Sequence, residues 1–253
     1  DVNMEVKNWT VHHPLYPERK VCDNVSIKVR KGEVVGISGL MGAGRTELAM
    51  SIFGQSYGTN ISGQLYLDGK EVHLKTIKQA IKNKLAYVTE DRKSVVKVKR
   101  VPIKLNTKLA NLDSISPRMI IDKDKEYQVA EEYRGKLKTK CPTVEQNVGN
   151  LSGGNQQKVL LAKWMFTDPD VLILDEPTRG IDVGAKYEIY CIINDLVAAG
   201  KSVVMISSEL PEVLGMSDRI YVMNEGKIAG ELSAEEACQE KIMSIIVTSG
   251  KGA

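Results

Sequence analysis

The sequence lacks the features that mark several common classes of protein. Its 253 residues contain four cysteines and no C-x-x-C pair, so it predicts neither a zinc site nor a disulfide framework. No apolar run approaches the roughly 18 residues of a membrane-spanning helix, and no signal peptide is visible. The net charge of +3 does not by itself imply a nucleic-acid partner, and we expect none. Internal repeats, sustained heptads and low-complexity tracts are absent too. What remains is the composition of one large α/β domain or two small ones.

A glycine-rich stretch at residues 39–48, GLMGAGRTEL, has the spacing of a phosphate-binding loop, G-x-x-x-x-G-K-[ST]. It follows an apolar strand-like run and precedes a helical pattern, which is the context that such a loop requires. Arg45 stands at the lysine position, so a plain glycine-rich turn is the alternative. We expect the glycines to let backbone N–H groups approach a phosphate and Thr46 to bind Mg²⁺. The expected nucleotide contacts are Gly39, Gly42, Ala43, Gly44, Arg45, Thr46 and Glu47.

A second candidate is the apolar run VLILDEP, residues 171–177, which we predict to be a buried parallel strand. It ends in Asp175 and Glu176, at the carboxyl edge where open α/β sheets bind ligands. Asp175 would hold Mg²⁺ and Glu176 would polarise an attacking water. Two solvated acids at the end of a strand are the alternative.

The stretch LSGGNQQKV, residues 151–159, places a serine and two glycines just before a helical pattern. Ser152 is suited to cap that helix. This stretch resembles the L-S-G-G-Q signature of ABC transporter ATPase domains, and 23 residues separate Ser152 from Asp175, as in that family. The resemblance implies that the signature acts on the nucleotide site of a second ATPase domain. The residues concerned are Ser152, Gly153, Gly154, Asn155 and Gln156.

The resemblance covers nearly the whole chain and implies further roles. Tyr16, 23 residues before Gly39, matches the aromatic residue that stacks on adenine, with an ordinary surface tyrosine as the alternative. Glu90 stands where the family has a glutamine that touches Mg²⁺ and the membrane partner. Asp182 matches the loop that crosses to the other domain. Ser208 stands where the family has a histidine that contacts the γ-phosphate, and all three histidines of the chain lie before residue 74.

Four departures from the family pattern, at Arg45, Glu90, Asn155 and Ser208, look like one set. Together with DEPTRGIDVGAK and ISSELPEVLGMSDRI, they resemble the second half of the double-ATPase subunit of bacterial monosaccharide importers. The chain also starts without methionine, so we expect a C-terminal half cut from such a protein.

The implied fold is α/β: a P-loop NTPase core with a mainly parallel sheet, an N-terminal antiparallel β subdomain and an inserted helical subdomain. We expect a single ABC ATPase domain over residues 1–253. Residues 1–90 and 168–253 would form the nucleotide-binding core, and residues 91–167 or thereabouts the helical subdomain with the signature.

The resemblance implies an ATPase that uses ATP and Mg²⁺ to couple energy to monosaccharide import. Its own site would hydrolyse ATP weakly, because Arg45 is a poorer fit than lysine and the histidine contact is lost. The implied partners are the N-terminal ATPase half of the same polypeptide, membrane permease subunits and, indirectly, a periplasmic sugar-binding protein. The location would be the cytoplasmic face of the bacterial inner membrane, and the isolated domain would be a monomer.

Other functions stay open at this point. They are a nucleotide-free structural or regulatory domain, and a ribosome-associated ABC protein, although the long charged linker of that class is missing. A chromosome-maintenance ATPase would need a long coiled coil between Gly44 and Leu151, where no heptads occur. The basic stretch from Arg92 to Lys108, with seven positive charges and no acid, is either a membrane-protein or lipid contact or a solvated loop.

Overall fold

The structure is a computed structural model that describes residues 1–89, 100–111 and 122–250. Its internal contacts divide the chain into two units. Unit 1 comprises Asp1–Tyr87, Asp170–Glu176 and Asp195–Ala253, and unit 2 comprises Val88–Pro169 and Pro177–Asn194. The segment Pro177–Asn194, part of the stretch that the resemblance implies for the nucleotide-binding core, lies in unit 2. Within the described ranges, no helix is both long enough and apolar enough to cross a membrane.

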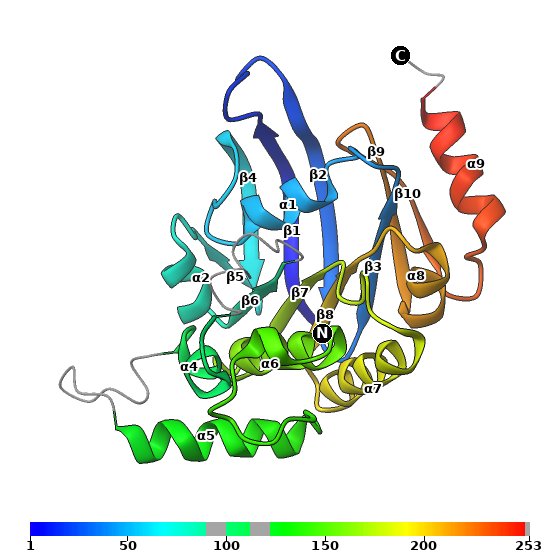
Figure 1. Cartoon of the computed structure of the whole chain (residues 1–253). Helices are drawn as coiled ribbons and strands as arrows, with labels where there is room; N and C mark the ends of the chain where they lie inside the picture. Colours follow the sequence, from blue (N-terminus) through cyan, green and yellow to red (C-terminus); the bar gives the residue numbers. More distant parts are fainter. Residues whose placement is uncertain (90–99, 112–121, 251–253) are drawn as a thin grey trace. The chain divides into compact units, whose positions relative to one another are not determined.

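Unit 1 contains an antiparallel sheet in the order β2-β1-β4-β5 (Figure 1). Its strands are β1 (Val2–His12), β2 (Lys20–Arg30), β4 (Thr59–Leu67) and β5 (Lys70–Val72). In β1 the buried side shifts from Met4 and Val6 to Trp9 and Val11. The shift follows a register irregularity around Asn8, which has a left-handed φ of 50°. This bulge lets one strand bury apolar side chains along its whole length.

The second sheet has the order β10-β9-β3-β8-β7-β6, and β3, β7, β8 and β9 pair in parallel. Its strands are β3 (Val34–Gly39), β6 (Leu85–Val88), β7 (Val171–Asp175), β8 (Ser202–Ile206), β9 (Arg219–Asn224) and β10 (Lys227–Ser233). Every residue of β7 and β8 is buried, as the near-continuous apolar runs predict for central parallel strands. The predicted α/β class with a mainly parallel sheet is confirmed. The carboxyl ends of β3, β7 and β8 bring residues 39, 175 and 206 to one edge of the sheet.

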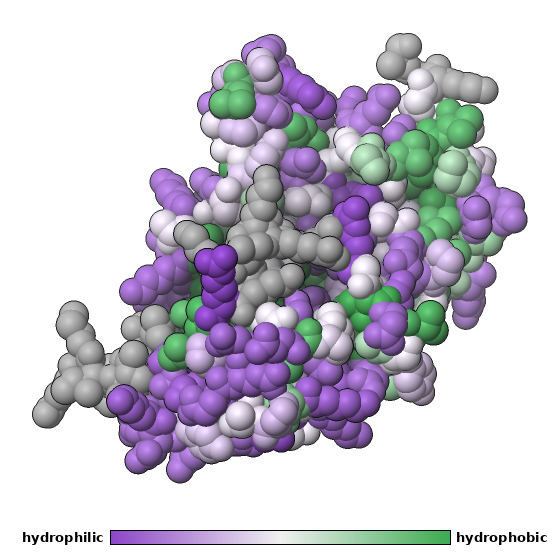
Figure 2. All heavy atoms as spheres, viewed as in Figure 1, coloured by the Kyte–Doolittle hydropathy of each residue, from purple (hydrophilic) through white to green (hydrophobic). Residues whose placement is uncertain are grey.

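The helices of unit 1 are α1 (Arg45–Ile52), α2 (Ile77–Lys82), α8 (Leu210–Met216) and α9 (Gln239–Ser249). In Figure 1, α8 and α9 lie beside the hairpin β9–β10. Their apolar faces form a core with that hairpin, built from Val213, Ile220, Val222, Ile242 and Ile246. Apolar residues remain exposed along α9 (Figure 2), among them Met243 and Val247. Helix α9 begins at Gln239, after a turn at residues 234–236.

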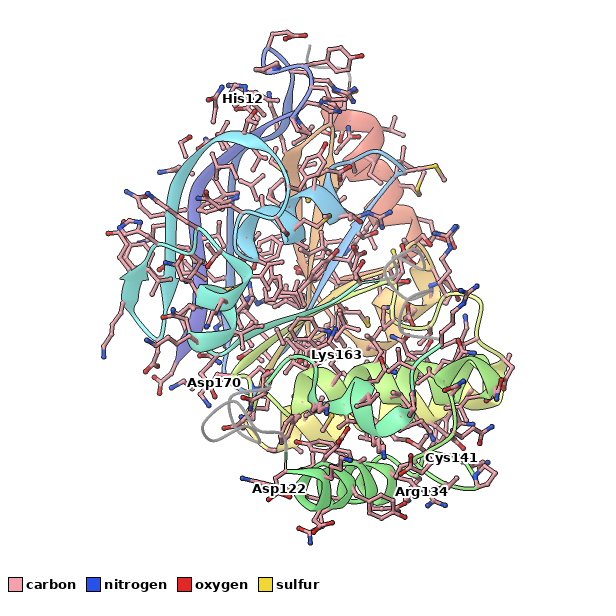
Figure 3. The ribbon with its side chains drawn as sticks, turned by 60° about the vertical axis from the view of Figure 1, so that its left-hand side comes forward. His12, Asp122, Arg134, Cys141, Lys163 and Asp170 are labelled. Atoms are coloured by element: carbon pink, nitrogen blue, oxygen red, sulfur yellow. The ribbon has the colours of Figure 1, made fainter. Side chains whose placement is uncertain are left out.

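Unit 2 is mainly helical. Its elements are α4 (Ile103–Lys108), α5 (Lys123–Lys136), the 3₁₀ turn η3 (Val148–Asn150), α6 (Gly153–Met165) and most of α7 (Val183–Ala198). Asp122 caps the first turn of α5, and Arg134 near its other end donates to the Cys141 carbonyl (Figure 3). A small core joins α4, α5, η3 and α6 through Ile103, Ala130, Val144, Val148, Leu151 and Val159. This core holds the start of α6, which carries the signature residues.

Candidate functional site

The glycine-rich loop between β3 and α1 requires glycine at two positions. Gly42 and Gly44 have left-handed φ angles of 80° and 96°. A Cβ on Gly44 would also lie 2.5 Å from the Val21 carbonyl oxygen. Gly44 is the N-cap of α1, and no side chain among the described residues caps that helix. The first N–H groups of α1 and the positive end of its dipole are therefore left to an anion.

Hydrogen bonds and close packing fix this loop against the hairpin β9–β10. The Ala43 carbonyl accepts a hydrogen bond of 2.9 Å from the Gly226 N–H. A Cβ on Gly39 would lie 2.5 Å from the Met223 carbonyl oxygen. The cradle is thus shaped by backbone contacts before any ligand binds, which reduces the entropy lost on binding.

Asp175 lies at the end of β7 and is buried. Burial raises the pKa of its carboxyl, while hydrogen bonds from Tyr87 and Thr46 act in the opposite direction. The Tyr87 hydroxyl donates to Oδ2 at 2.8 Å. Oδ1 is buried and has no hydrogen-bond partner among the described residues. An orphaned carboxylate oxygen beside a threonine hydroxyl fits a hard divalent cation such as Mg²⁺.

Three other predicted residues meet beside Asp175. Arg45 Nη1 donates to the Ser207 carbonyl oxygen at 2.7 Å. The Ser208 hydroxyl donates to Glu176 Oε2 at 3.0 Å. Glu176 has a left-handed φ of 51°, which is uncommon for a non-glycine residue, and its N–H donates to the Ile206 carbonyl at 2.8 Å. The loop, the end of β7 and the turn after β8 therefore form one hydrogen-bonded group.

Tyr16 is exposed on the loop between β1 and β2, with 56% of its surface accessible. Its ring lies 5.2 Å from that of His13, between centroids, and His13 lies 6.4 Å from Tyr57. Burial, and then the charge of Glu47 in α1, raise the pKa of Tyr57. Tyr16, His13 and Tyr57 thus form one aromatic group.

The signature residues lie in unit 2, at the start of α6. Ser152 is the N-cap, and its hydroxyl accepts a 2.8 Å hydrogen bond from the Asn155 side-chain amide. The Lys140 N–H in turn donates to Asn155 Oδ1 at 2.9 Å. Asp182 caps the start of α7 by accepting from the Ala185 N–H at 3.0 Å.

The structure brings the signature and Asp182 into one pocket of about 280 Å³. The lining residues are Lys140, Ser152, Gly154, Asn155, Asp182, Gly184, Ala185 and Glu188. Gly153 lies next to this group, 3.7 Å (from an added Cβ) from the Gly180 carbonyl, and Gln156 turns back to donate to the Leu151 carbonyl at 2.7 Å. These hydrogen bonds within unit 2 fix the signature residues at the start of α6.

Glu90 and residues 92–99 of the basic stretch lie outside the described residues. In the part of the chain that is described, no group of three or more His, Cys, Asp or Glu side chains could hold a metal ion. A cation at Asp175 would therefore take its other ligands from Thr46, water or a bound phosphate.

Three contributors to the site were not predicted from the sequence. Tyr87 is an ordinary strand tyrosine until its hydroxyl meets Asp175, 88 positions away. Ser207 contributes its backbone carbonyl, which every residue type has. His13 stands three positions before Tyr16, and this closeness in the sequence could have identified it. In the structure its Nδ1 accepts the N–H groups of Leu15 and Tyr16 at 3.1 and 3.2 Å.

Comparisons with known proteins agree with this geometry. The L-arabinose transport ATP-binding protein of Geobacillus stearothermophilus is 58% identical over 246 residues, or 97% of this chain and 48% of that protein. The xylose import ATP-binding protein of Thermoanaerobacter pseudethanolicus is 56% identical over 99% of this chain and 49% of its own length. The ribose import ATP-binding protein of Clostridium tetani is 49% identical over 88% and 44%. The chain spans about half the length of these curated relatives.

Solved structures share the fold. A nucleotide-free ATP-binding cassette from an ABC transporter superposes with a TM-score of 0.81 at 22% identity, covering 99% of this chain and 97% of that one. Another cassette, in its ADP conformation, gives a TM-score of 0.79 at 24% identity over the full length of both chains. The ABC transporter family model matches residues 22–179, from β2 past the end of β7. The match contains the phosphate loop, the signature and the Asp175–Glu176 pair, and it places this chain in the ABC transporter family.

Proposed function

We propose that the chain is an ATP-binding, energy-coupling domain of a bacterial importer of monosaccharides. The relatives' names, which concern arabinose, xylose and ribose, support this class of cargo. The proposal rests mainly on one observation: a glycine cradle at the start of α1, whose Thr46 hydroxyl lies beside Asp175, an acid with one buried oxygen that has no hydrogen-bond partner among the described residues. That combination suits a nucleotide phosphate together with a divalent cation.

In the site of unit 1, the loop from Gly39 to Glu47 binds the phosphates and Tyr16 stacks on the base. Thr46 and Asp175 hold Mg²⁺, which supplies positive charge next to the phosphates, and Glu90 is a further candidate ligand. Glu176 orients the attacking water. Its carboxylate is held by Ser208, and the guanidinium of Arg45 is already bonded to a carbonyl. Each preorganised contact that is lost lowers the rate about 10²-fold, so we propose that this site hydrolyses ATP slowly.

In unit 2, the signature serves a different site. Ser152, Gly153 and Gly154 present a hydroxyl and helix N–H groups to the phosphates of a second ATPase domain, with Asn155, Gln156 and Asp182 supporting them. The natural partner is an N-terminal ATPase half of the same polypeptide, which the half-length matches support. This assignment implies two further partners, the permease subunits and, indirectly, a periplasmic sugar-binding protein. It also implies a location at the cytoplasmic face of the inner membrane. Alone, the chain is a monomer.

Calorimetric titration of the chain with ATP and Mg²⁺, with phosphate release measured on the same sample, tests the proposal. We expect binding with turnover at least 10²-fold below that of an intact ABC ATPase. No binding would leave a structural or regulatory domain as the better description. Brisk turnover would refute the weakened site and indicate a full ATPase that pairs with itself.

A further inference from the structure

Arg45 has a contact that its place in the loop does not predict. The residue begins α1, yet its guanidinium donates at 2.7 Å to the carbonyl of Ser207, 162 positions later. A guanidinium carries five N–H donors in a planar fork, so this bond leaves donors available. The side chain is half-buried, which holds the fork between the loop and the turn that follows β8.

The contacted turn is compact and leads to Glu176. Ser207 is buried, and its hydroxyl accepts a 3.0 Å hydrogen bond from the Glu209 N–H. The next side chain, Ser208, donates to Glu176 Oε2 at 3.0 Å. The turn residues Ser207, Ser208 and Glu209 carry no positive charge with which to contact an anion directly. The guanidinium of Arg45 brings a positive charge to this turn and links it to the phosphate loop.

We propose that Arg45 is a positioning residue that reports phosphate occupancy of the loop to the turn at residues 207–209. One N–H of the fork stays on the Ser207 carbonyl while the others bind a phosphate oxygen, and the turn then orders Ser208 and the Glu176 carboxylate. A lysine ammonium is a point charge without this fork, so it does not serve both acceptors in the same way. This inference rests on the proposed function, because it assumes that the loop binds ATP.

Hydrogen–deuterium exchange of the 253-residue chain, with and without ATP–Mg²⁺, tests the link. In the natural sequence, ATP slows exchange over residues 206–210 by about tenfold, the factor expected for one strengthened charge-assisted hydrogen bond. Arg45→Lys still binds ATP but loses this response. Arg45→Ala exchanges about tenfold faster in the turn even without nucleotide. Ser208→Ala keeps the ATP response, because Arg45 and the Ser207 carbonyl are intact.

Arg30→Lys is the matched control, since Arg30 lies on β2 and contacts Glu33 at 3.6 Å. It leaves exchange at residues 206–210 unchanged in both states. ATP binding without any response of the turn would overturn the role of Arg45 and leave the proposed function standing. An undiminished response in Arg45→Lys would also overturn it. Failure of the natural sequence to bind ATP would overturn both proposals.

Discussion

The buried position of Asp175 opposes the charged form of its carboxyl, which a bound cation would require. Its carboxyl is buried, which raises its pKa, and one of its oxygens has no partner among the described residues. Burying an unpaired charge destabilises the folded state. Because the folded-state pKa is above the unfolded one, the native protein binds this proton more readily. The associated stability is present at low pH and is lost as pH rises through the folded pKa.

Asp175→Asn tests this conflict. The substitution removes the buried charge and keeps an acceptor for the Tyr87 hydroxyl, so we expect the free energy of unfolding at neutral pH to rise by about 1 kcal/mol. The gain vanishes as the solution is made acidic. The same variant loses the Mg²⁺ dependence of ATP binding, because the amide is a weaker cation ligand. Urea unfolding across pH and calorimetry with and without Mg²⁺ measure the two effects.

Asp170→Asn is the control for that experiment, because Asp170 lies just before the other end of β7 with an exposed side chain paired to Lys201 at 3.5 Å. It shows neither the stability gain nor the loss of Mg²⁺ dependence. If Asp175→Asn were less stable than the natural sequence at neutral pH, the account of a strained, cation-ready carboxylate would be wrong.

At the scale of elements, α6 and α7 touch through two small residues of unit 2. A Cβ on Gly154 would lie 2.4 Å from the Ala185 Cβ. Gly154→Ala therefore overpacks the contact and lowers the free energy of unfolding by about 2 kcal/mol. Ala185→Gly costs about 1 kcal/mol through lost helix propensity. The double variant recovers most of the loss, because the new methyl occupies the place of the old one.

Chemical denaturation of the four proteins in this cycle gives the coupling energy directly. Gly153→Ala is the matched control, since its added Cβ would have no neighbour nearer than 3.7 Å and is tolerated. Additive losses in the double variant would mean that Gly154 is required for its backbone rather than for this helix contact.

Arg219, the first residue of β9, contacts Lys28 of β2 and Glu33, which directly precedes β3. Its guanidinium donates to Glu33 Oε1 at 2.6 Å and to the Lys28 carbonyl at 2.7 Å. Burial raises the pKa of Glu33, but hydrogen bonds from Arg219 and the Arg30 N–H outweigh it, so the net pKa is lowered. This pair therefore stabilises the fold above the unfolded pKa of glutamate, and the effect is lost as pH falls through the lower, folded pKa.

Arg219→Met removes the closest charged partner of the buried Glu33 and leaves it the Arg30 N–H at 2.7 Å and the Arg30 guanidinium at 3.6 Å. We expect a loss of about 2 kcal/mol at neutral pH. Adding Glu33→Gln removes the stranded charge, restores part of the stability and flattens its dependence on pH between about 3 and 5. Thermal or urea unfolding of both variants across this range checks the pair. Equal losses in the single and double variants would show that lost packing of Arg219, not charge, dominates.

Local chemistry explains which elements could be predicted from the sequence. A near-continuous apolar run favours a buried parallel strand, as in β3, β7 and β8. Glycine favours a turn with a left-handed φ, as at residues 42 and 44. The short helices α2 and α8 were not predicted, because helices of six and seven residues depend on tertiary packing. Contacts such as Arg45 to Ser207 join positions 162 apart, and no local pattern encodes them.

At the scale of the whole molecule, the two units serve two different sites. Unit 1 holds the phosphate loop, Asp175 and Glu176, whereas unit 2 holds the signature and Asp182. Because the signature acts on the site of a partner half in our proposal, changes in unit 2 should leave nucleotide binding by this chain unaltered. Such changes should lower ATP turnover only when the two ATPase halves are present together.

Ser152→Ala separates the two sites. ATP affinity of the 253-residue chain stays within about twofold, since the Ser152 hydroxyl bonds to Asn155 within unit 2. ATP turnover by the assembly with its partner half falls about 10²-fold. The substitution also removes the cap of α6, which lowers the free energy of unfolding by about 1 kcal/mol.

Thr76→Ala is the control, because Thr76 caps α2 by accepting from the Gln79 N–H at 3.2 Å and lies outside both sites. It has the same stability cost without the loss of turnover. Equal turnover in the two variants would mean that Ser152 acts only as a helix cap, and that this chain does not complete its partner's site through the signature.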